Sequence, residues 1–240
     1  MSTRLANQGR LIDRSKQIEF TFNGKRMKGY AGDTLASALL ANDQMMMGRS
    51  FKYHRPRGVV ASGSEEPNAL MQLGVGDRYE PNQRATTTEL FSGLTAQSQN
   101  HWPSLEFDVL SINNKLSRFL TAGFYYKMFI HPRPLWKHVY EPIIRRSAGL
   151  GAAPDKELKD ADTYEHFYFF CDVLVIGGGV AGLQAAKAAA ASGAKVMLME
   201  QNNYWGGRAP VDGGTIDGDT PEAWIEKTLE ELRGMENVTL

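Results

Sequence analysis

Apolar and polar positions alternate near the start of the chain in a pattern that predicts a β-hairpin. Residues 18–22 read IEFTF and residues 26–30 read RMKGY, with Asn23-Gly24 between them. Asn-Gly is typical of a two-residue hairpin turn, because both residues readily adopt positive φ. Two strands are therefore expected, one on either side of this turn.

A helix is expected directly after the hairpin. Asp33 is placed to act as its N-cap, and Leu35, Leu39 and Leu40 put an apolar stripe on one face of TLASALLAN. A hairpin followed by a packed helix is the opening of a β-grasp fold. We therefore expect an α+β, ferredoxin-like β-grasp domain over residues 1–100.

Residues 45–76 are rich in Gly, Pro and Arg, which predicts a loop region. Plant-type ferredoxins hold an iron-sulfur cluster in such a region with cysteines spaced C-x4-C-x2-C. This chain has one cysteine, Cys171, far outside the region. The β-grasp domain is therefore expected to lack a cluster, and Cys171 is expected to be an inert residue at the head of a buried strand.

The residues from 101 to 170 contain many aromatic side chains, and Pro132 and Pro134 interrupt any long helix there. Short helices are expected over 111–120 and 134–146, followed by a linker or exposed loop over 147–162. We interpret 101–170 as a connecting segment that covers another surface. In isolation such a segment exposes apolar area.

Residues 171–240 have the pattern of the first part of a doubly wound (Rossmann-like) α/β domain. The apolar run DVLVIG predicts a buried parallel strand, an alanine-rich helix is expected over 181–192, and KVMLM predicts a second strand. Gly193 is placed to end the helix in a left-handed conformation. An amphipathic helix is expected to begin at Thr220-Pro221, followed by ENVTL as the start of a third strand.

The turn between the first of these strands and its helix has the spacing G-x-G-x-x-G, at Gly177, Gly179 and Gly182. In dinucleotide-binding folds the first glycine permits the tight turn, the second lets the backbone approach a pyrophosphate, and the third allows the helix to pack on the strand. The N–H groups and the positive dipole end of the helix then face the phosphates. Gly178 and Ala181 lie in the same turn and are expected to contribute to cofactor binding.

Glu200 ends the second strand, about 20 residues past the glycines, where an acidic side chain accepts hydrogen bonds from the adenosine ribose. A carboxylate there repels a 2′-phosphate, which favours NAD or FAD over NADP. Gln201, Gly207 and Arg208 follow in QNNYWGGRAP. Gly207 would allow a close approach and Arg208 would neutralise phosphate, and the alternative is a solvent-exposed loop.

Composition and charge exclude some classes of function. Lys and Arg together number 27, as do Asp and Glu, so no overall field attracts nucleic acid or an anionic membrane. No stretch reaches the roughly 20 apolar residues that span a bilayer, and the polar N-terminus lacks the pattern of a secretory signal. We therefore expect a protein that binds neither nucleic acid nor a membrane. The single cysteine fits a reducing compartment, so the cytoplasm is the expected location.

The other polar clusters are expected to carry no chemistry. The basic loop, Arg49 to Arg57, is interpreted as solvated or partner-facing rather than phosphate-binding. Glu65 and Glu66 are adjacent carboxylates on a loop, and both are expected to face water. The five histidines have no spacing suited to a metal, so no metal site is expected.

Several long blocks of sequence go beyond the glycine motif: GKRMKGYAGDTLASALLAN, GRSFKYHRPRGVVASGSEEPNAL, TAGFYYKMFIHPRPLWKHVYEPIIRRSAGLG and CDVLVIGGGVAGLQAA. Together they closely resemble the N-terminal part of the large α subunit of heterotetrameric sarcosine oxidase. The resemblance covers almost the whole chain. It implies a cluster-free ferredoxin-like domain followed by a domain that carries NAD at the three glycines and Glu200, with Gln201, Gly207 and Arg208 as further contacts.

The resemblance also implies that the chain acts in a complex with β, γ and δ subunits. In the family, FAD in the β subunit oxidises the amine and FMN lies between α and β. Sarcosine is demethylated to glycine, the one-carbon unit passes to tetrahydrofolate through a later part of the α subunit, and peroxide is released. None of the catalytic residues of the complex is expected in this chain. A chain that ends at Leu240 is then expected to be a truncated subunit, an expressed fragment or a split gene product, inactive alone.

Two alternatives to this function stay open. One is a subunit of an opine dehydrogenase or a hydrogen cyanide-forming amino acid dehydrogenase, which would bind FAD at the same glycines. The other is a non-catalytic scaffold with an empty nucleotide site. The identity of the nucleotide released on denaturation separates the first alternative from NAD binding, and titration with NAD separates the second.

Overall fold

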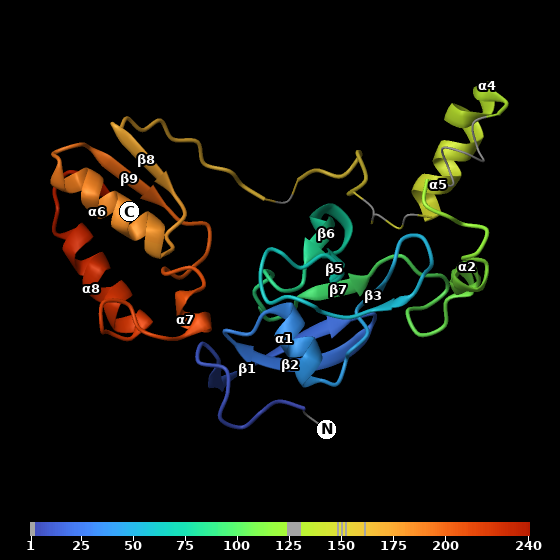
Figure 1. Ribbon diagram of the computed structural model, residues 1–240, viewed down its shortest axis with the longest axis horizontal. Coiled ribbons are helices and arrows are strands. Elements are labelled where there is room, and N and C mark those ends of the chain that lie inside the picture. Colours follow the sequence, from blue (N-terminus) through green and yellow to red (C-terminus); the bar gives the residue numbers. More distant parts are fainter. Residues whose placement is uncertain (1–2, 124–130, 148, 150, 152, 161) are drawn as a thin grey trace. The chain divides into compact units, whose positions relative to one another are not determined.

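The computed structural model describes the chain except residues 1–2, 124–130, 148, 150, 152 and 161. The chain divides into two compact units, Met1–Thr163 and Tyr164–Leu240 (Figure 1). Each unit has a hydrophobic core of its own. Each is therefore described by itself.

The first unit is built on a five-stranded mixed sheet with strand order β2-β1-β7-β5-β6. β1 (Asp13–Phe22) and β2 (Lys25–Ala31) form an antiparallel hairpin, which confirms the sequence prediction, and β1 runs parallel to β7 (Thr95–Ser98). β5 (Leu70–Leu73) is antiparallel to β7 and to β6 (Glu80–Arg84). The parallel pair lies in the middle of the sheet, with antiparallel hairpins on either side.

The turn of the first hairpin lies at Asn23 and Gly24, as the sequence predicts. Both residues have positive φ, 47° and 77°. The Asn23 side chain also ties this turn to the end of β7, because its Nδ2 donates to Ser98 Oγ at 2.8 Å and its Oδ1 accepts from Ser98 N at 2.9 Å. The hairpin is thereby fixed against the strand that runs parallel to β1.

Helix α1 (Leu35–Ala41) is capped one residue later than the sequence prediction. Thr34 Oγ1 accepts from the N–H of Ser37, and Ser37 Oγ accepts from the N–H of Thr34, so Thr34 is the N-cap. The prediction of Asp33 as the cap was wrong. Asp33 is instead buried and holds the Arg4 guanidinium, with Oδ2 2.6 Å from Nη2.

The core of the first unit lies between α1 and the sheet. Alternate residues of β1 point into it, as the two-residue period of a strand requires, and Phe20 and Phe22 are both buried. Leu35 and Leu39 of α1 pack against the same cluster, together with Met71 of β5. The apolar stripe read from the sequence is therefore the buried face of the helix.

Shorter elements complete the described part of the first unit. They are β3 (Gly48–Arg49), β4 (Pro56–Arg57), the 3-10 turns η1 (Gly76–Arg78) and η2 (Val109–Ser111), α2 (Ile112–Lys115), α4 (Arg133–Leu135), the π-helical turn η3 (Trp136–Tyr140) and α5 (Glu141–Ser147). Short helices thus occur where the sequence predicts them.

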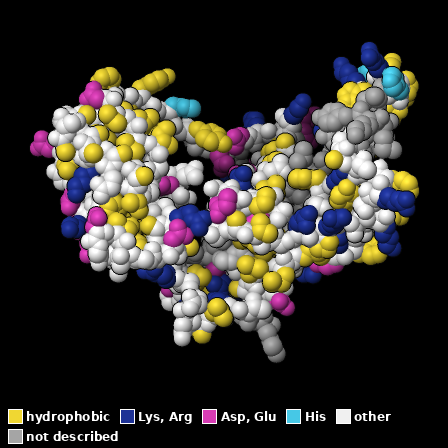
Figure 2. Space-filling model, in the orientation of Figure 1, with side chains coloured by type: hydrophobic (Ala, Val, Ile, Leu, Met, Phe, Trp, Pro, Cys, Tyr) yellow, Lys and Arg dark blue, Asp and Glu magenta, His cyan; other side chains and the backbone are white. Residues whose placement is uncertain are grey.

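The aromatic segment leaves large apolar side chains exposed, as predicted for this segment in isolation. Trp102, Phe107 and Phe119 are 63%, 69% and 67% exposed. Figure 2 shows hydrophobic side chains interspersed with charged ones on the visible face of the protein. Within the described ranges of the chain, no helix has the length and hydropathy required to cross a membrane.

The side chains of Arg49 and His54 in the basic loop are held within the chain, contrary to the expectation that the loop is solvated or faces a partner. Phe51 and Arg55 of the same loop are exposed. The Arg49 side chain is only 7% exposed. Its guanidinium donates to the carbonyl oxygens of Leu105, His54 and Glu106 at 2.8, 2.9 and 3.1 Å. These acceptors lie up to 57 residues away, so periodicity along the chain gives no sign of them.

Glu66 is buried, so the expectation that it faces water was wrong, whereas Glu65 is exposed. The Glu66 carboxylate accepts four backbone hydrogen bonds of 2.7 to 3.2 Å, from the N–H groups of Val60, Ala61, Asn68 and Ala69. Burial by itself raises the pKa of Glu66, but the four donors outweigh it and hold the pKa below its ordinary value. The carboxylate closes the loop between β4 and β5.

The second unit contains three parallel strands in the order β10-β9-β8. β8 (Val173–Ile176) leads into α6 (Val180–Ala191), and β9 (Val196–Met199) follows. After it come α7 (Ala209–Asp212), α8 (Pro221–Arg233) and β10 (Val238–Thr239). The first three strands of a dinucleotide-binding sheet have this order, which agrees with the predicted fold class.

One face of this sheet is covered and the other is open. α6 and α8 pack together over the covered face, where Val196 and Leu198 of β9 are buried. On the opposite face Leu174, Ile176 and Met199 are 50%, 80% and 52% exposed. Parallel sheets are normally covered on both faces, so this face is an unpartnered apolar surface of the described residues.

Candidate dinucleotide site

The turn after β8 requires glycine at two of its positions for reasons internal to the fold. Gly177 has φ of 99°, a conformation that residues with a side chain rarely adopt. A Cβ on Gly182 would collide with the carbonyl oxygen of Gly177. The first and third glycines of the motif therefore make the tight turn and the close packing of α6 on β8.

Gly178 has to be a glycine because Trp205, which follows Glu200 in the sequence, packs against it. A Cβ at this position would collide with the indole ring of Trp205. The carbonyl oxygen of Gly178 accepts from the N–H of Gly206 at 2.8 Å, and Gly179 and Gly206 form an isolated parallel bridge. The residues after β9 are thereby held against the glycine turn.

Gly179 has no such internal requirement. It is the N-cap of α6 with φ of −70° and ψ of 177°, a conformation open to any residue. A Cβ built on it would have no atom within 4 Å, apart from its chain neighbours and the backbone of the helix. The fold alone does not explain a glycine here, and the missing side chain leaves room for a ligand beside the backbone.

The N-terminus of α6 has no side-chain cap, unlike α1 and α8, which are capped by Thr34 and Thr220. The first hydrogen bond of α6 joins Leu183 N to Gly179 O at 2.9 Å. The N–H groups of the first turn, which includes the exposed Ala181, thus lack helical partners and are free to face an anion. The helix dipole adds partial positive charge at the same place.

The Glu200 carboxylate is directed at the glycine turn. Its Oε2 accepts from Gly178 N at 2.7 Å, and its Oε1 accepts from both N and Nδ2 of Asn202 at 2.8 Å. Burial opposes ionisation, but the backbone donors of Asn202, Gly178 and Gln201 outweigh it and hold the pKa of Glu200 below its ordinary value. Glu200 is therefore an ionised acceptor beside the turn, as a ribose-binding residue must be.

The other expected residues lie in the segment that follows β9. Gly207 has φ of 56°, and a Cβ on it would lie 3.2 Å from Gly179 Cα, so it approaches the turn closely. Gln201 is exposed. Arg208 is half-exposed and forms an ion pair with Asp212, 3.0 Å from Nη2 to Oδ1. To neutralise a phosphate, its guanidinium must share or exchange this contact.

Sequence reasoning missed two residues of the site, Trp205 and Asn202. Trp205 packs against Gly178, and Asn202 orients Glu200. The position of an aromatic residue directly before Gly206-Gly207 was the only local signal for the first. Among the described residues, no group of three or more His, Cys, Asp or Glu side chains could hold a metal ion.

Comparison with known proteins identifies relatives of this chain. The chain is 53% identical over 237 residues to sarcosine oxidase subunit alpha of Rhizobium meliloti (strain 1021), covering 99% of the chain and 24% of that protein. This chain is a homologue of the sarcosine oxidase α subunits. The α subunit of Corynebacterium sp. (strain U-96) is 32% identical over 235 residues, which are 96% of this chain and 19% of that protein. The chain thus spans about a quarter or less of the length of these relatives.

Two family models match separate parts of the chain, and one solved structure has a similar fold. Residues 15–101 match the 2Fe-2S iron-sulfur cluster binding domain, and residues 172–236 match the FAD dependent oxidoreductase family. The structure of L-proline dehydrogenase from P. horikoshii superimposes with a TM-score of 0.54 at 18% identity, covering 98% of this chain and 35% of that one. At this identity the likeness shows a shared fold only.

The residues of the first unit do not fit a 2Fe-2S cluster, although its family model is named for one. Such clusters are held by cysteine thiolates, with histidine as a replacement in some centres. Residues 15–101 contain no cysteine, because the one cysteine of the chain is Cys171. The first unit therefore has the fold of the cluster-binding domain without its ligands.

Proposed function

We propose that the second unit binds an adenine dinucleotide, with the diphosphate over Gly179 and the first turn of α6. The observation that carries the proposal is that nothing in the fold requires a glycine at 179. A backbone without a side chain, next to an uncapped helix, is what a close-lying diphosphate needs. Gly177, Gly178 and Gly182 shape the turn, and Ala181 offers a first-turn N–H.

We propose NAD as the dinucleotide. The ionised Glu200 carboxylate accepts from the ribose hydroxyls and repels the 2′-phosphate of NADP. Gly207 allows the approach of the segment after β9, and Gln201 and Arg208 are further proposed contacts. When bound, NAD supplies a nicotinamide ring that can accept a hydride, whereas this chain's own groups bind and orient it.

The chain is proposed to act in a flavin-dependent sarcosine oxidase complex with β, γ and δ subunits, as its homology to α subunits supports. The complex would contain FAD and FMN, convert sarcosine to glycine, pass the one-carbon unit to tetrahydrofolate and release peroxide. We propose no catalytic residue in this chain, which would contribute nucleotide binding and assembly. The proposed location is the cytoplasm.

Calorimetric titration of the full chain with NAD tests nucleotide binding. The matched variant is Gly179→Asp, which places a carboxylate where the diphosphate is proposed to lie. Saturable binding by the wild type that is lost in the variant supports the proposal. Equal behaviour of the two proteins favours a scaffold with an empty nucleotide site.

FAD at the same glycines is a second candidate, favoured by the match of residues 172–236 to the FAD dependent oxidoreductase family. It would make the chain a subunit of a related opine or hydrogen cyanide-forming amino acid dehydrogenase. Denaturation of the purified protein and chromatography of the released nucleotide distinguish the two. Release of nicotinamide dinucleotide supports NAD, whereas release of flavin from this chain rejects NAD in favour of FAD.

A further inference from the structure

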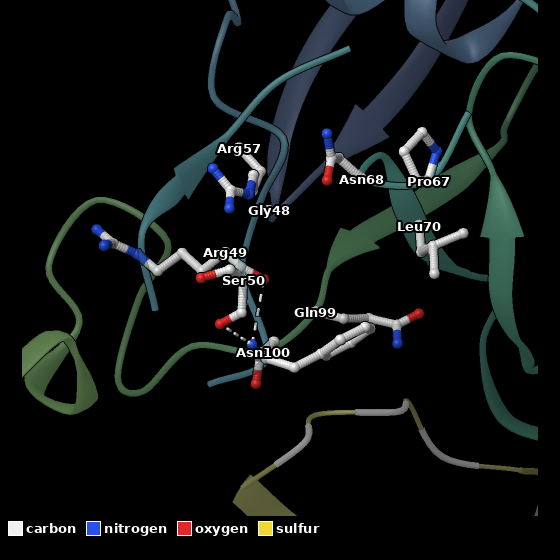
Figure 3. Close-up of a pocket in the computed structure, with 10 residues that line it drawn as sticks. Gly48, Arg49, Ser50, Arg57, Pro67, Asn68, Leu70, Gln99 and Asn100 are labelled. Atoms are coloured by element: carbon white, nitrogen blue, oxygen red, sulfur yellow. Dashed lines mark hydrogen bonds between the residues drawn. The ribbon is translucent and has the colours of Figure 1, made fainter. Parts of the chain in front are cut away.

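A pocket of about 240 Å³ lies in the first unit beside β3 and β4 (Figure 3). The described residues that line it include Arg49 and Arg57 and no acidic side chain. Figure 3 shows Arg57 and Asn68 along one side of the pocket and Gln99 and Asn100 along the other. In a chain of zero net charge, this is a local concentration of hydrogen-bond donors and positive charge.

The two arginines of the pocket differ in whether their guanidinium groups already have hydrogen-bond partners. The Arg49 guanidinium is already bound to three backbone carbonyl groups, and its side chain extends away from Asn68 and Leu70 in Figure 3. The Arg57 guanidinium is partly buried and has no hydrogen bond or ion pair with any described residue. Arg57 is therefore the free cation of this pocket.

The backbone around Arg57 is fixed, although its side chain is unpaired. Arg57 pairs with Gly48 across β3 and β4, and its carbonyl oxygen accepts from Met47 N at 2.8 Å. Gly48 contributes no side chain, which leaves space beside Arg57. In the loop before β5, Asn68 is held by its N–H bond to Glu66 at 2.7 Å, and no described residue bonds its side-chain amide.

We propose that this pocket binds a carboxylate group. The planar guanidinium of Arg57 matches a carboxylate in two parallel hydrogen bonds, and the Asn68 amide supplies a further donor from a fixed backbone. Phe51 and Leu70 line the same pocket and provide apolar contact for the carbon chain that carries the group. The carboxylate comes either from an acidic side chain of a polypeptide or from a free organic acid.

The test uses the full chain labelled with ¹⁵N and titrated with propionate. Saturable shifts are expected in the amide resonances of Gly48 and Asn68 and in the side-chain resonance of Arg57. Propionamide, which has the same shape without the charge, is expected to produce at least tenfold weaker binding, because charged hydrogen bonds are the stronger ones. Equal binding of propionate and propionamide would overturn the proposal.

Variants separate Arg57 from general charge effects. Arg57→Gln is expected to weaken propionate binding at least tenfold, and Arg57→Lys to weaken it severalfold, because lysine cannot bind the group through a planar fork. The matched control is Arg26→Gln, which removes an exposed arginine of β2 and is expected to bind like the wild type. Each variant is also unfolded thermally, and an unchanged midpoint shows that the loss is local. Wild-type affinity in Arg57→Gln would reject the site.

A second ligand identifies the source of the carboxylate. N-acetyl-aspartate N-methylamide presents the same group on a polypeptide backbone. Tighter binding of this compound than of propionate supports recognition of an acidic side chain of a partner polypeptide. Tighter binding of propionate supports a free organic acid, and loss of both in Arg57→Gln is expected in either case.

Discussion

Nδ1 of His54 lies 2.7 Å from Oδ2 of Asp108, and both side chains are fully buried. The other oxygen of Asp108 accepts from the backbone N–H groups of Trp102 and Leu110 at 3.0 and 3.1 Å. Arg49 Nε lies 3.6 Å from Oδ2. One carboxylate thus joins the basic loop to the segment that follows the sheet.

Asp108→Asn is expected to lower the free energy of unfolding by about 3 kcal/mol. The substitution removes the buried carboxylate charge that faces His54 and Arg49. Urea denaturation measures the change. Asp77→Asn makes the same chemical change at an exposed position and is expected to alter stability by less than about 0.5 kcal/mol. Equal effects of the two substitutions would show that the buried pair does not stabilise the fold.

Glu66→Gln is expected to destabilise the first unit by about 2 to 3 kcal/mol, because an amide cannot accept all four backbone hydrogen bonds. The pKa of Glu66 is lowered in the folded state. The contribution of the ionised Glu66 to the free energy of unfolding is therefore fully present above the ordinary glutamate pKa. It is lost as the pH falls through the lowered pKa of Glu66 in the folded state.

Unfolding of wild type and Glu66→Gln between pH 7 and pH 3 tests this dependence. The difference in stability between them is expected to shrink towards the acid end of this range. Glu65→Gln, at the exposed neighbouring residue, is the control and is expected to leave stability nearly unchanged. A pH-independent difference for Glu66→Gln would contradict the role of the ionised form.

The paired variants Gly179→Ala and Gly182→Ala separate binding from folding in the glycine turn. Gly182→Ala is expected to cost about 1 to 3 kcal/mol of stability, because its Cβ collides with the Gly177 carbonyl oxygen. Gly179→Ala is expected to leave stability within about 0.5 kcal/mol of wild type and to weaken NAD binding at least tenfold. Thermal unfolding and calorimetric titration give the two readouts. A strong loss of stability in Gly179→Ala would remove the reason to place a ligand there.

Glu200→Gln is expected to weaken NAD binding by about tenfold and to reduce the preference for NAD over NADP, because the carboxylate charge is lost. The pKa of Glu200 is lowered, so wild-type binding should stay constant from pH 8 to the ordinary glutamate pKa and weaken below it. This acid weakening should be absent in Glu200→Gln. Glu236→Gln, at an exposed position away from the turn, is the control. Unchanged NADP discrimination in Glu200→Gln would count against ribose binding by this residue.

The sequence predicts the parts of the fold that depend on short-range signals. Asn23-Gly24 determines the first hairpin, and Thr220-Pro221 begins α8 as expected. The strand, glycine turn and helix from Val173 to Ala191 also follow from local spacing, because Gly177 and Gly182 have steric tasks within a few residues. The rest of the site depends on the contact between Gly178 and Trp205, which are 27 positions apart, so the spacing of the glycine motif does not predict it.

The predictions that failed have different physical reasons. Glu66 is buried because its own loop folds around it, with backbone donors two to six residues away. Arg49 and His54 of the basic loop, by contrast, have partners in a distant segment. Arg49 reaches residues 56 and 57 positions away, and His54 reaches Asp108 across 54 positions. Asp33 failed as a cap for a different reason, because the next residue, Thr34, has a hydroxyl that reaches the helix amide.

The inward-turned carboxylate of Glu66 also determines what holds the loop between β4 and β5 in place. Four backbone donors converge on an acceptor that the polypeptide itself carries. The shape of this loop is therefore set by a single charged side chain, and the whole segment from Val60 to Ala69 responds together when that charge is removed.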